Sequence, residues 1–232
     1  MDETTARRLV ALNEAFYSQF AAPFAASRAA PQPGYARLLA YLPAGRPRLL
    51  DVGCGEGRFG RYLLAAGVTA EVVGVDFSAA LLARNDVPGV HLQRDLSRPA
   101  ALGDLGRFDL IVCLSTLQHI PGQDNRARLL AEMGGCLAAG GHVALANWQF
   151  MGSARQRRKV RPWAEAGFDA AELEEGDYLL SWQRGGAGRR YVALLDEAAT
   201  ARLAVAAGLR IVEQFRSDGR EGDLNLYTVL AG

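Results

Sequence analysis

Cysteine, histidine and long apolar runs are scarce in this sequence, and each shortage removes a class of protein. The three cysteines, Cys54, Cys113 and Cys136, form no close pair, which predicts reduced thiols in a cytoplasmic protein rather than a disulfide framework. The three histidines are dispersed without the spacing of metal ligands, so we expect no metal site. No apolar run approaches the length of a membrane span, and the first residues lack a signal-peptide pattern, so we expect no membrane association.

An excess of charge of one sign is also missing. The 232 residues carry a formal net charge of +1, and 50% of them are hydrophobic while 22% are charged. This composition predicts a globular domain with an appendage. It gives no global electrostatic reason to expect a nucleic-acid or membrane partner, so a nucleic acid would have to be held by a local basic patch.

A glycine-rich loop between a strand-like and a helix-like segment dominates what is present. The apolar run from Leu49 to Val52 passes through Gly53, Gly55 and Gly57 into the segment 58–66. Strand, glycine turn and helix form the usual context of a nucleotide-type cofactor loop, where glycines let the backbone approach the ligand closely. A helix start beyond the loop offers free N–H groups to an anion. A purely structural glycine turn is the alternative.

Two further acidic residues follow strand-like segments. The second strand, 70–76, ends in Asp76 about twenty residues beyond the loop, where a carboxylate can accept hydrogen bonds from ribose hydroxyls. The alternative is a role for Asp76 in capping the next helix, although Ser78 is the better cap. A third short strand, 90–93, is followed by Asp95, which is otherwise an ordinary turn residue.

The strongest strand, Phe108 to Leu114, leads into a turn that contains Ser115 and His119. Its near-continuous apolar run predicts burial on both faces. Ligands of open α/β sheets lie beyond the carboxyl ends of the strands, which places Leu114 and Ser115 beside a cofactor and His119 within reach of an acceptor. A role for His119 in packing or capping is the alternative.

The remaining segments complete an α/β pattern. We expect helices over 6–20, 35–42, 125–138 and 196–207, and strands over 142–148, 209–215 and 224–230. Alternation of strands and helices predicts a Rossmann-like, mostly parallel seven-stranded sheet with helices on both faces. We divide the chain into an N-terminal helical leader, 1–45, and a domain, 46–232.

Residues 149–195 form an insertion far longer than a usual connection, which favours a functional role on the substrate side. The segments 178–182 and 190–194 predict a hairpin. The basic run 155–161 is either a solvated loop or a patch that contacts phosphate. In the leader, Phe20 and Phe24 are expected to pack the helix onto the sheet, whereas Tyr17 and Arg28 are candidates for a lid.

Taken together, the loop Asp51-x-Gly53-x-Gly55-x-Gly57, Asp76, Asp95 and the strand 108–114 resemble a class I methyltransferase that depends on S-adenosyl-L-methionine (SAM). The resemblance covers nearly the whole core and implies SAM as cofactor, with S-adenosyl-L-homocysteine (SAH) as product. It also implies that Asp95 meets the adenine amino group and that the last strand of the sheet is antiparallel. The cofactor-binding residues expected from it are Asp51, Gly53, Cys54, Gly55, Gly57, Asp76, Phe77, Asp95, Leu96, Leu114 and Ser115.

A narrower resemblance covers the leader, 16–28, the Gln118-His119 turn, the strand 177–182 and the pair Arg190-Tyr191. These segments are similar to the tRNA wobble-uridine methyltransferases, which esterify the carboxylate of carboxymethyluridine. This resemblance implies a tRNA-modifying enzyme in the cytoplasm. It also implies that a small zinc-binding activating partner protein is possible.

Methyl transfer from a sulfonium relies mainly on aligning the acceptor. A carboxylate acceptor is already ionised and needs only orienting donors, whereas a hydroxyl or amine acceptor needs a base, for which His119 is the candidate. The orienting and catalytic candidates are His119, Arg28, Tyr17, Tyr178, Trp182 and Arg190. The alternatives to a tRNA enzyme are a small-molecule O- or N-methyltransferase with the insertion as a lid, and a SAM-binding protein without activity.

Overall fold

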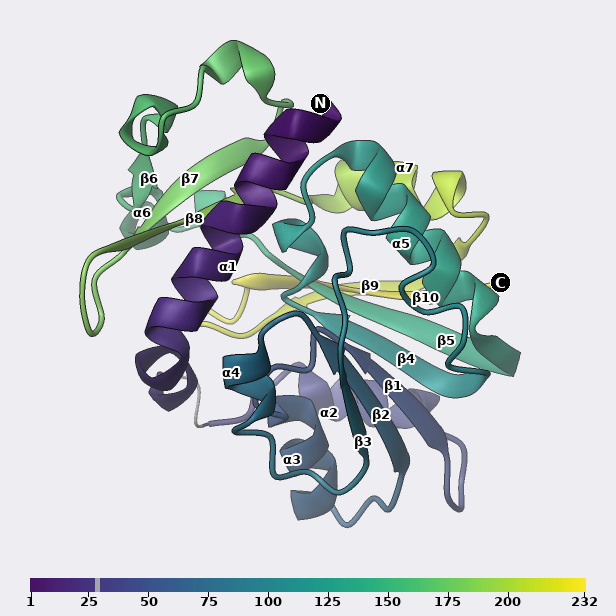
Figure 1. Ribbon diagram of the computed structural model, residues 1–232. Helices are drawn as coiled ribbons and strands as arrows, with labels where there is room; N and C mark the ends of the chain where they lie inside the picture. Colours follow the sequence, from purple (N-terminus) through teal and green to yellow (C-terminus); the bar gives the residue numbers. More distant parts are fainter. Residues whose placement is uncertain (28–29) are drawn as a thin grey trace.

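A seven-stranded sheet forms the centre of the computed structural model, which describes residues 1–27 and 30–232 (Figure 1). Within these residues the strand order is β3-β2-β1-β4-β5-β10-β9. The chain runs outward from β1 to β3 and then crosses back to β4 on the other side of β1, so the loops that follow β1 and β4 meet at one edge of the sheet. The strands are β1 (Arg48–Val52), β2 (Glu71–Asp76), β3 (Val90–Gln93), β4 (Phe108–Leu114), β5 (Leu137–Trp148), β9 (Arg210–Ser217) and β10 (Asn225–Ala231).

The last strand, β10, is antiparallel to both of its neighbours, β5 and β9, while β1 to β5 pair in parallel. The predicted Rossmann-like sheet with an antiparallel last strand is therefore confirmed. All of β10 is buried, as a strand in the interior of a sheet with two covered faces should be.

Helices cover both faces of the sheet (Figure 1). On one face, α2 (Tyr35–Leu38), the 3₁₀ turn η1 (Leu39–Tyr41) and α3 (Arg58–Ala65) pack on residues such as Leu49 and Val112. On the other, α5 (Gln123–Gly135) and α7 (Glu197–Ala206) pack on residues such as Leu50 and Ile111. Adjacent residues of β1 and β4 thus enter different cores, because successive side chains of a strand point to opposite faces.

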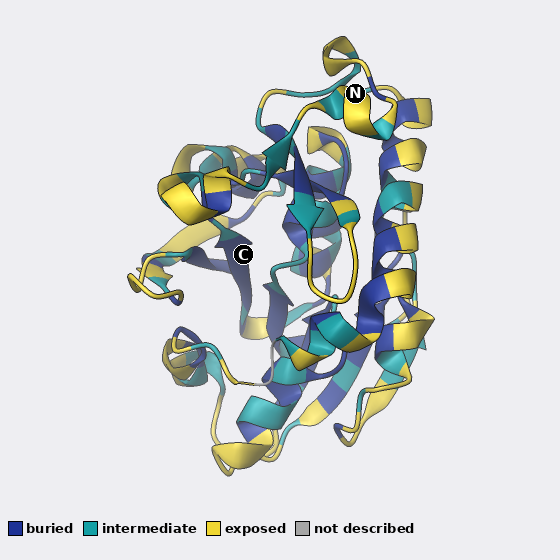
Figure 2. Ribbon diagram, turned by 90° about the vertical axis from the view of Figure 1, so that its left-hand side faces the viewer, coloured by how far each residue is buried: buried dark blue, intermediate teal, exposed yellow. Residues whose placement is uncertain are grey.

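The leader forms one long helix, α1 (Glu3–Ala26), with Asp2 as its N-cap. It contacts β8 of the insertion and α4 (Ala79–Leu82) beside the main sheet. Figure 2 shows one side of α1 buried and the other exposed. The predicted helix, 6–20, ended too early, because the chain continues past Pro23 with a kink at Phe20, where the backbone leaves helical geometry. Proline removes a hydrogen bond to the preceding turn, so it bends this helix without ending it.

The insertion builds a small separate sheet of β6 (Val160–Arg161), β7 (Asp177–Trp182) and β8 (Gly188–Ala193). Strands β7 and β8 form the predicted antiparallel hairpin. The short helices of this segment are η3 (Phe150–Gly152), α6 (Ala154–Arg157), η4 (Trp163–Ala166) and η5 (Ala170–Glu172). Because α1 packs on β8, the leader and the insertion, which lie far apart in the sequence, are in contact.

Other predicted boundaries also differ from the structure. Strand β5 begins at Leu137, earlier than expected. The pair Gly140-Gly141 does not interrupt the strand, because Gly140 adopts a positive φ there. The predicted helix over 35–42 is a four-residue helix followed by a 3₁₀ turn, and the helix expected at 125–138 begins and ends earlier. No helix among the described residues has the length and apolar character that crossing a membrane requires.

Candidate active site

A pocket lies at the carboxyl ends of β1, β2 and β4, with α1 on its far wall. All but one of the predicted cofactor residues line it, so the tertiary structure brings together segments that are far apart in the sequence. The exception is Gly57. The lining residues from the prediction are Asp51, Gly53, Cys54, Gly55, Asp76, Phe77, Asp95, Leu96, Leu114 and Ser115.

The glycine loop needs glycine at its first and last positions. Gly53 and Gly57 have φ values of +81° and +83°, which favour residues without a Cβ. A Cβ on Gly53 would lie 2.0 Å from Thr116 Oγ1, and one on Gly57 would lie 2.2 Å from Asn85 Oδ1. Gly57 therefore has a packing role at the start of α3, while Gly53 lets the loop after β4 approach the loop after β1.

Three buried carboxylates gather around this loop. Asp76 accepts hydrogen bonds from the backbone N–H groups of Gly55 (2.9 Å) and Ser78 (2.8 Å). Burial raises the pKa of Asp76 to about 6, and it raises the pKa of Asp51 to about 8, where the charges of Asp76 and Glu56 add to the effect. Oε1 of Glu56 is buried and accepts no hydrogen bond, with Arg61 3.9 Å away. The pocket is thus prepared for a cation.

Ser78, which the sequence favoured over Asp76 as the cap, caps the helix after β2, and its hydroxyl accepts from the N–H of Leu81. Asp76 is therefore free of that capping role. Asp95 accepts from the N–H of Ser97 at 2.9 Å and pairs with Arg98 at 3.1 Å. Asp95 and the buried Leu96 line the pocket at the end of β3.

Tyr17 and His119 form a hydrogen-bonded pair on the pocket wall. The Tyr17 hydroxyl lies 3.1 Å from His119 Nε2, and His119 Nδ1 lies 3.0 Å from the carbonyl oxygen of Tyr191. A carbonyl only accepts, so Nδ1 carries a proton and donates to it, while Nε2 faces the Tyr17 hydroxyl.

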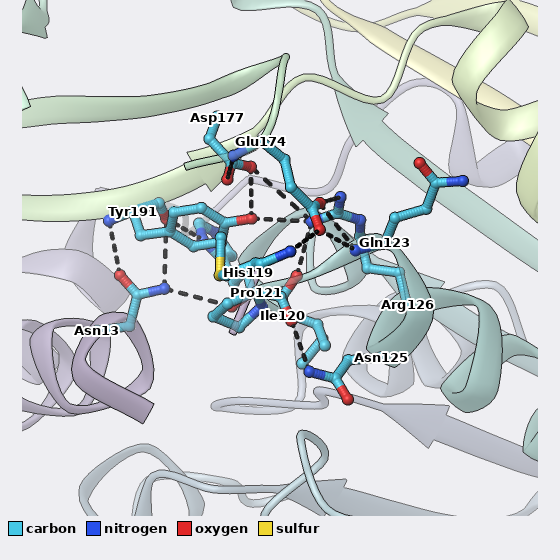
Figure 3. A network of polar contacts seen from close by, with 11 residues as sticks. Asn13, His119, Ile120, Pro121, Gln123, Asn125, Arg126, Glu174, Asp177 and Tyr191 are labelled. Carbon is cyan, nitrogen blue, oxygen red and sulfur yellow. Dashed lines mark hydrogen bonds and ion pairs between the residues drawn. The ribbon is translucent and has the colours of Figure 1, made fainter. Parts of the chain in front are cut away.

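A buried polar network holds this histidine in place (Figure 3). Asn13 of α1 accepts from the N–H of Tyr191 at 2.8 Å, and its amide donates to the carbonyl oxygens of Tyr191 and His119. The Tyr191 hydroxyl donates to Asp177 at 2.8 Å and accepts from Arg126 at 2.8 Å. The network joins α1, the turn after β4 and the hairpin β7–β8, so it fixes His119 relative to the leader.

The other predicted catalytic residues lie beyond this wall. Arg190 is buried and its Nη1 donates to the Tyr17 hydroxyl at 3.3 Å. The Trp182 ring contacts those of Phe16 and Phe24, and Tyr178 packs on Phe150. The structure therefore joins Tyr17, His119 and Arg190 in one chain of contacts, with Trp182 beside Arg190 and Tyr178 in a separate cluster. Arg28 lies outside the described residues.

Sequence reasoning missed several residues of the site. Glu56 and Thr116 line the pocket, Asn13 orients His119, and Trp148 and Lys159 lie near Arg190. Glu56 had a signal, because it stands inside the glycine loop. The others come from a helix face, a strand end and the insertion, where no local pattern distinguishes a site residue. No group of potential metal ligands is found in the part of the chain that the structure describes.

Comparisons with known proteins agree with this geometry. A family model described as "Methyltransferase domain" matches residues 50–143. The chain is 38% identical over 113 residues to trans-aconitate 2-methyltransferase of Methylobacterium radiotolerans, covering 47% of this chain and 42% of the relative. It is 33% identical over 105 residues to the ubiquinone biosynthesis O-methyltransferase of Alkalilimnicola ehrlichii, covering 41% and 39%. This chain thus matches about two fifths of the length of these curated relatives.

Solved structures show the fold over nearly the whole chain. The DhpI–SAM–HEP complex aligns with a TM-score of 0.64 at 18% identity, covering 97% of this chain and 98% of that one. The CcbJ methyltransferase from Streptomyces caelestis also aligns with a TM-score of 0.64, at 20% identity, covering 94% and 97%. The fold is that of class I SAM-dependent methyltransferases. Residues 50–143 thus match a methyltransferase domain, and the chain has the fold of SAM-dependent methyltransferases.

Proposed function

We propose that this protein is an active methyltransferase that transfers the methyl group of SAM to an oxygen atom of a small organic molecule. The observation that carries the proposal is the Tyr17–His119 pair on the wall of an acid-lined pocket. Two of the relatives carry names of small-molecule methyltransferases, trans-aconitate 2-methyltransferase and ubiquinone biosynthesis O-methyltransferase, which supports a small acceptor.

The residues of the pocket fit SAM. The cofactor has a sulfonium and an ammonium cation. Oε1 of Glu56, which accepts no hydrogen bond from the described residues, and the buried Asp51 suit positive charge. Asp76 would hold the ribose hydroxyls and Asp95 the adenine amino group. The apolar side chains of Phe77, Leu96 and Leu114 on the pocket wall would enclose the adenine ring. Bound SAM supplies an electrophilic methyl group that an acceptor oxygen takes in an in-line displacement.

The chain's own contribution is to place the acceptor and to manage its proton. The Tyr17 hydroxyl and His119 Nε2 lie on the same wall, so an acceptor oxygen can hydrogen-bond there. A hydroxyl acceptor would give up its proton to His119 Nε2, directly or through the Tyr17 hydroxyl. A carboxylate acceptor is already ionised and would need only the Tyr17 donor to orient it. The leader, 1–45, and the insertion, 149–195, would close the acceptor side.

A tRNA wobble uridine with a carboxymethyl group is the second candidate acceptor, as the narrower resemblance implies. It is favoured by one observation, the basic run of the insertion. Arg155, Arg157 and Arg158 are exposed, and none of them pairs with a carboxylate of residues 1–27 or 30–232. Such a surface would suit phosphates. A small zinc-binding partner belongs to this second candidate and stays a prediction.

Transfer of labelled methyl from SAM tests both candidates at once. The protein would be offered tRNA that bears carboxymethyluridine beside a pool of small organic acids and phenols. Label in the small-molecule fraction supports the first proposal. Label in the tRNA that mild base removes as methanol would identify an ester on RNA and replace it. Bound SAM without transfer to any fraction would contradict catalytic activity.

A further inference from the structure

A buried cation without a carboxylate partner lies directly behind the Tyr17–His119 pair. Arg190, on β8, is only 4% exposed, and its Nη1 donates to the Tyr17 hydroxyl at 3.3 Å. Its Nε is buried and has no acceptor, and no carboxylate of the described residues forms an ion pair with it. Buried charges in proteins are normally paired, because desolvation of an ion is costly. This unpaired guanidinium therefore needs an explanation.

Arg126 shows how the same chain treats a buried arginine that has a structural role. It is 4% exposed, pairs with Glu174 at 2.9 Å and lies 4.0 Å from Asp177. The Nε atoms of both arginines lack an acceptor, but Arg190 lacks the carboxylates as well. The difference shows that the fold can supply acids to a buried guanidinium and does not supply them at Arg190.

Aromatic rings surround Arg190 in place of acids. The guanidinium carbon lies 5.3 Å from the ring centre of Phe16, 5.9 Å from Phe24, 5.4 Å from Trp148 and 5.7 Å from Trp182. Ring faces attract a cation but do not satisfy N–H donors in the guanidinium plane. We call Arg190, these four rings and Lys159 the Arg190 chamber.

Two further groups in the chamber lack a negative partner. The indole Nε1 of Trp148 is buried and donates to nothing in the described part of the chain. The Lys159 ammonium lies 5.8 Å from the Trp148 ring centre, and its pKa is lowered by burial and by the charges of Arg190, Arg155 and Arg184. Lys159 and Trp182 are partly exposed, so the chamber reaches the surface at these residues.

We propose that the Arg190 chamber binds a carboxylate of the methyl acceptor, and that this carboxylate is distinct from the oxygen that takes the methyl group. Nη1 is engaged by Tyr17, which lines the cofactor pocket, whereas Arg190 itself does not line it. The edge formed by Nε and Nη2 is left for a ligand, and its two parallel donors match a carboxylate. The proposal rests on the proposed function, because it takes the neighbouring pocket as the SAM site.

The acceptor defined by this arrangement has two functional groups. Its reacting oxygen lies at the Tyr17–His119 pair, and its anchoring carboxylate lies on the far side of Tyr17. Anchoring energy from a group that does not react can position the one that does. Diacids and hydroxy acids therefore belong to the substrate class, whereas their amides and neutral analogues do not.

Calorimetric titration of the SAH-saturated protein tests the anchor. The probes are trans-aconitate, a triacid, and linear diacids of four to six carbons, each compared with its fully amidated analogue. At least one of these acids should bind about tenfold or more tightly than its amide, and Arg190→Met should remove this preference. Arg190→Lys, which keeps the charge and loses the fork, should weaken diacid binding by about tenfold. Arg189→Met is the matched control, since the adjacent Arg189 is exposed and pairs with Glu165.

A second measurement is the thermal stability of the protein in the absence of any acid ligand. Removing an unpaired buried charge should stabilise the ligand-free protein, so Arg190→Met should raise its melting temperature by about 3 °C. A structural Arg190 would give the opposite sign. The proposal is overturned by a fall in melting temperature, by an acid preference that survives Arg190→Met, or by no acid that binds more tightly than its fully amidated analogue.

The titration also separates this proposal from the proposed function. Arg190→Met should leave the Kd of SAH within about twofold of the wild-type value. Wild-type protein that fails to bind SAH would contradict the methyltransferase proposal itself. Normal SAH binding with no acid preference would contradict the anchor alone.

Discussion

The cofactor pocket and the Arg190 chamber share the wall that contains Tyr17, but they gather charge of opposite sign. The pocket collects Asp51, Glu56 and Asp76 around the glycine loop, and the chamber holds Arg190 with Lys159 among aromatic rings. In each region charges of the same sign lie close together, with Arg61, 3.9 Å from Glu56, as a counter-charge beside the pocket. On our proposals both regions are completed by ligands, a cation on one side and an anion on the other.

The pKa shifts in the two regions follow the same physical rule with opposite results. Burial raises the pKa of Asp51 to about 8 and that of Asp76 to about 6, and burial lowers the pKa of Lys159. In every case the charged form is disfavoured, because water is removed and like charges lie nearby. A ligand of opposite charge would restore it.

The largest effect is expected at the shared wall. His119→Ala should lower kcat by about 10²- to 10⁴-fold if the acceptor is a hydroxyl, because His119 would then be the base. For a carboxylate acceptor the loss should stay within about tenfold. Tyr17→Phe keeps the ring packing and tests the hydroxyl alone. Steady-state kinetics measure both, and His142→Ala, a change at a histidine remote from the pocket, is the control. Unchanged kcat in both site variants would remove this pair from the mechanism.

Replacing Asp76 should mainly lower the affinity for the cofactor. Asp76→Ala removes the proposed ribose acceptor and two hydrogen bonds to the backbone, so SAM and SAH should bind about 100-fold more weakly. Titration calorimetry gives the affinities. Asp86→Ala changes an exposed acid near the same loop and should have almost no effect. Equal losses in the two variants would show that the charge of the region matters and not the position of Asp76.

The pH dependence should differ in sign between cofactor affinity and stability. SAM affinity should rise about tenfold from pH 5.5 to 8.5, as Asp76 and Asp51 ionise around pH 6 and 8. The ligand-free protein should lose stability over the same window. Both carboxyl pKa values are higher in the folded chain than in the unfolded chain, so the folded state binds more protons. Titration and thermal melting across pH measure the two trends, and parallel trends would contradict the charge argument.

The smallest effect is expected on the exposed basic run. Arg158→Ala should change kcat/KM for a small acceptor by less than about twofold, because its side chain lies on the surface. With tRNA as acceptor, loss of one phosphate contact should reduce by about one the slope of the logarithm of the binding constant against the logarithm of the salt concentration. Binding measured at several salt concentrations decides between these outcomes.

Much of the fold and the cofactor pocket of the site could be predicted from local sequence patterns. The loop from Asp51 to Gly57 predicted a cofactor pocket because glycine spacing and the following helix start act within a few residues of one another. Asp76 and Asp95 were predictable because a strand that ends at the sheet edge delivers its last side chain there. The mostly parallel sheet followed from the alternation of helices and strands, and the antiparallel last strand from the resemblance, whereas the order of the strands came from the structure.

Only the tertiary structure decided how the acceptor side is built. The contacts of Arg190 with Phe16, Trp148 and Tyr17 join three segments that lie far apart in the sequence, and no local rule predicts that packing. The sequence by itself determined the acids and glycines of the cofactor pocket, because each acts near its own strand end. The absence of a carboxylate at Arg190 became visible only in the folded chain, because pairing of a buried charge depends on neighbours from other elements.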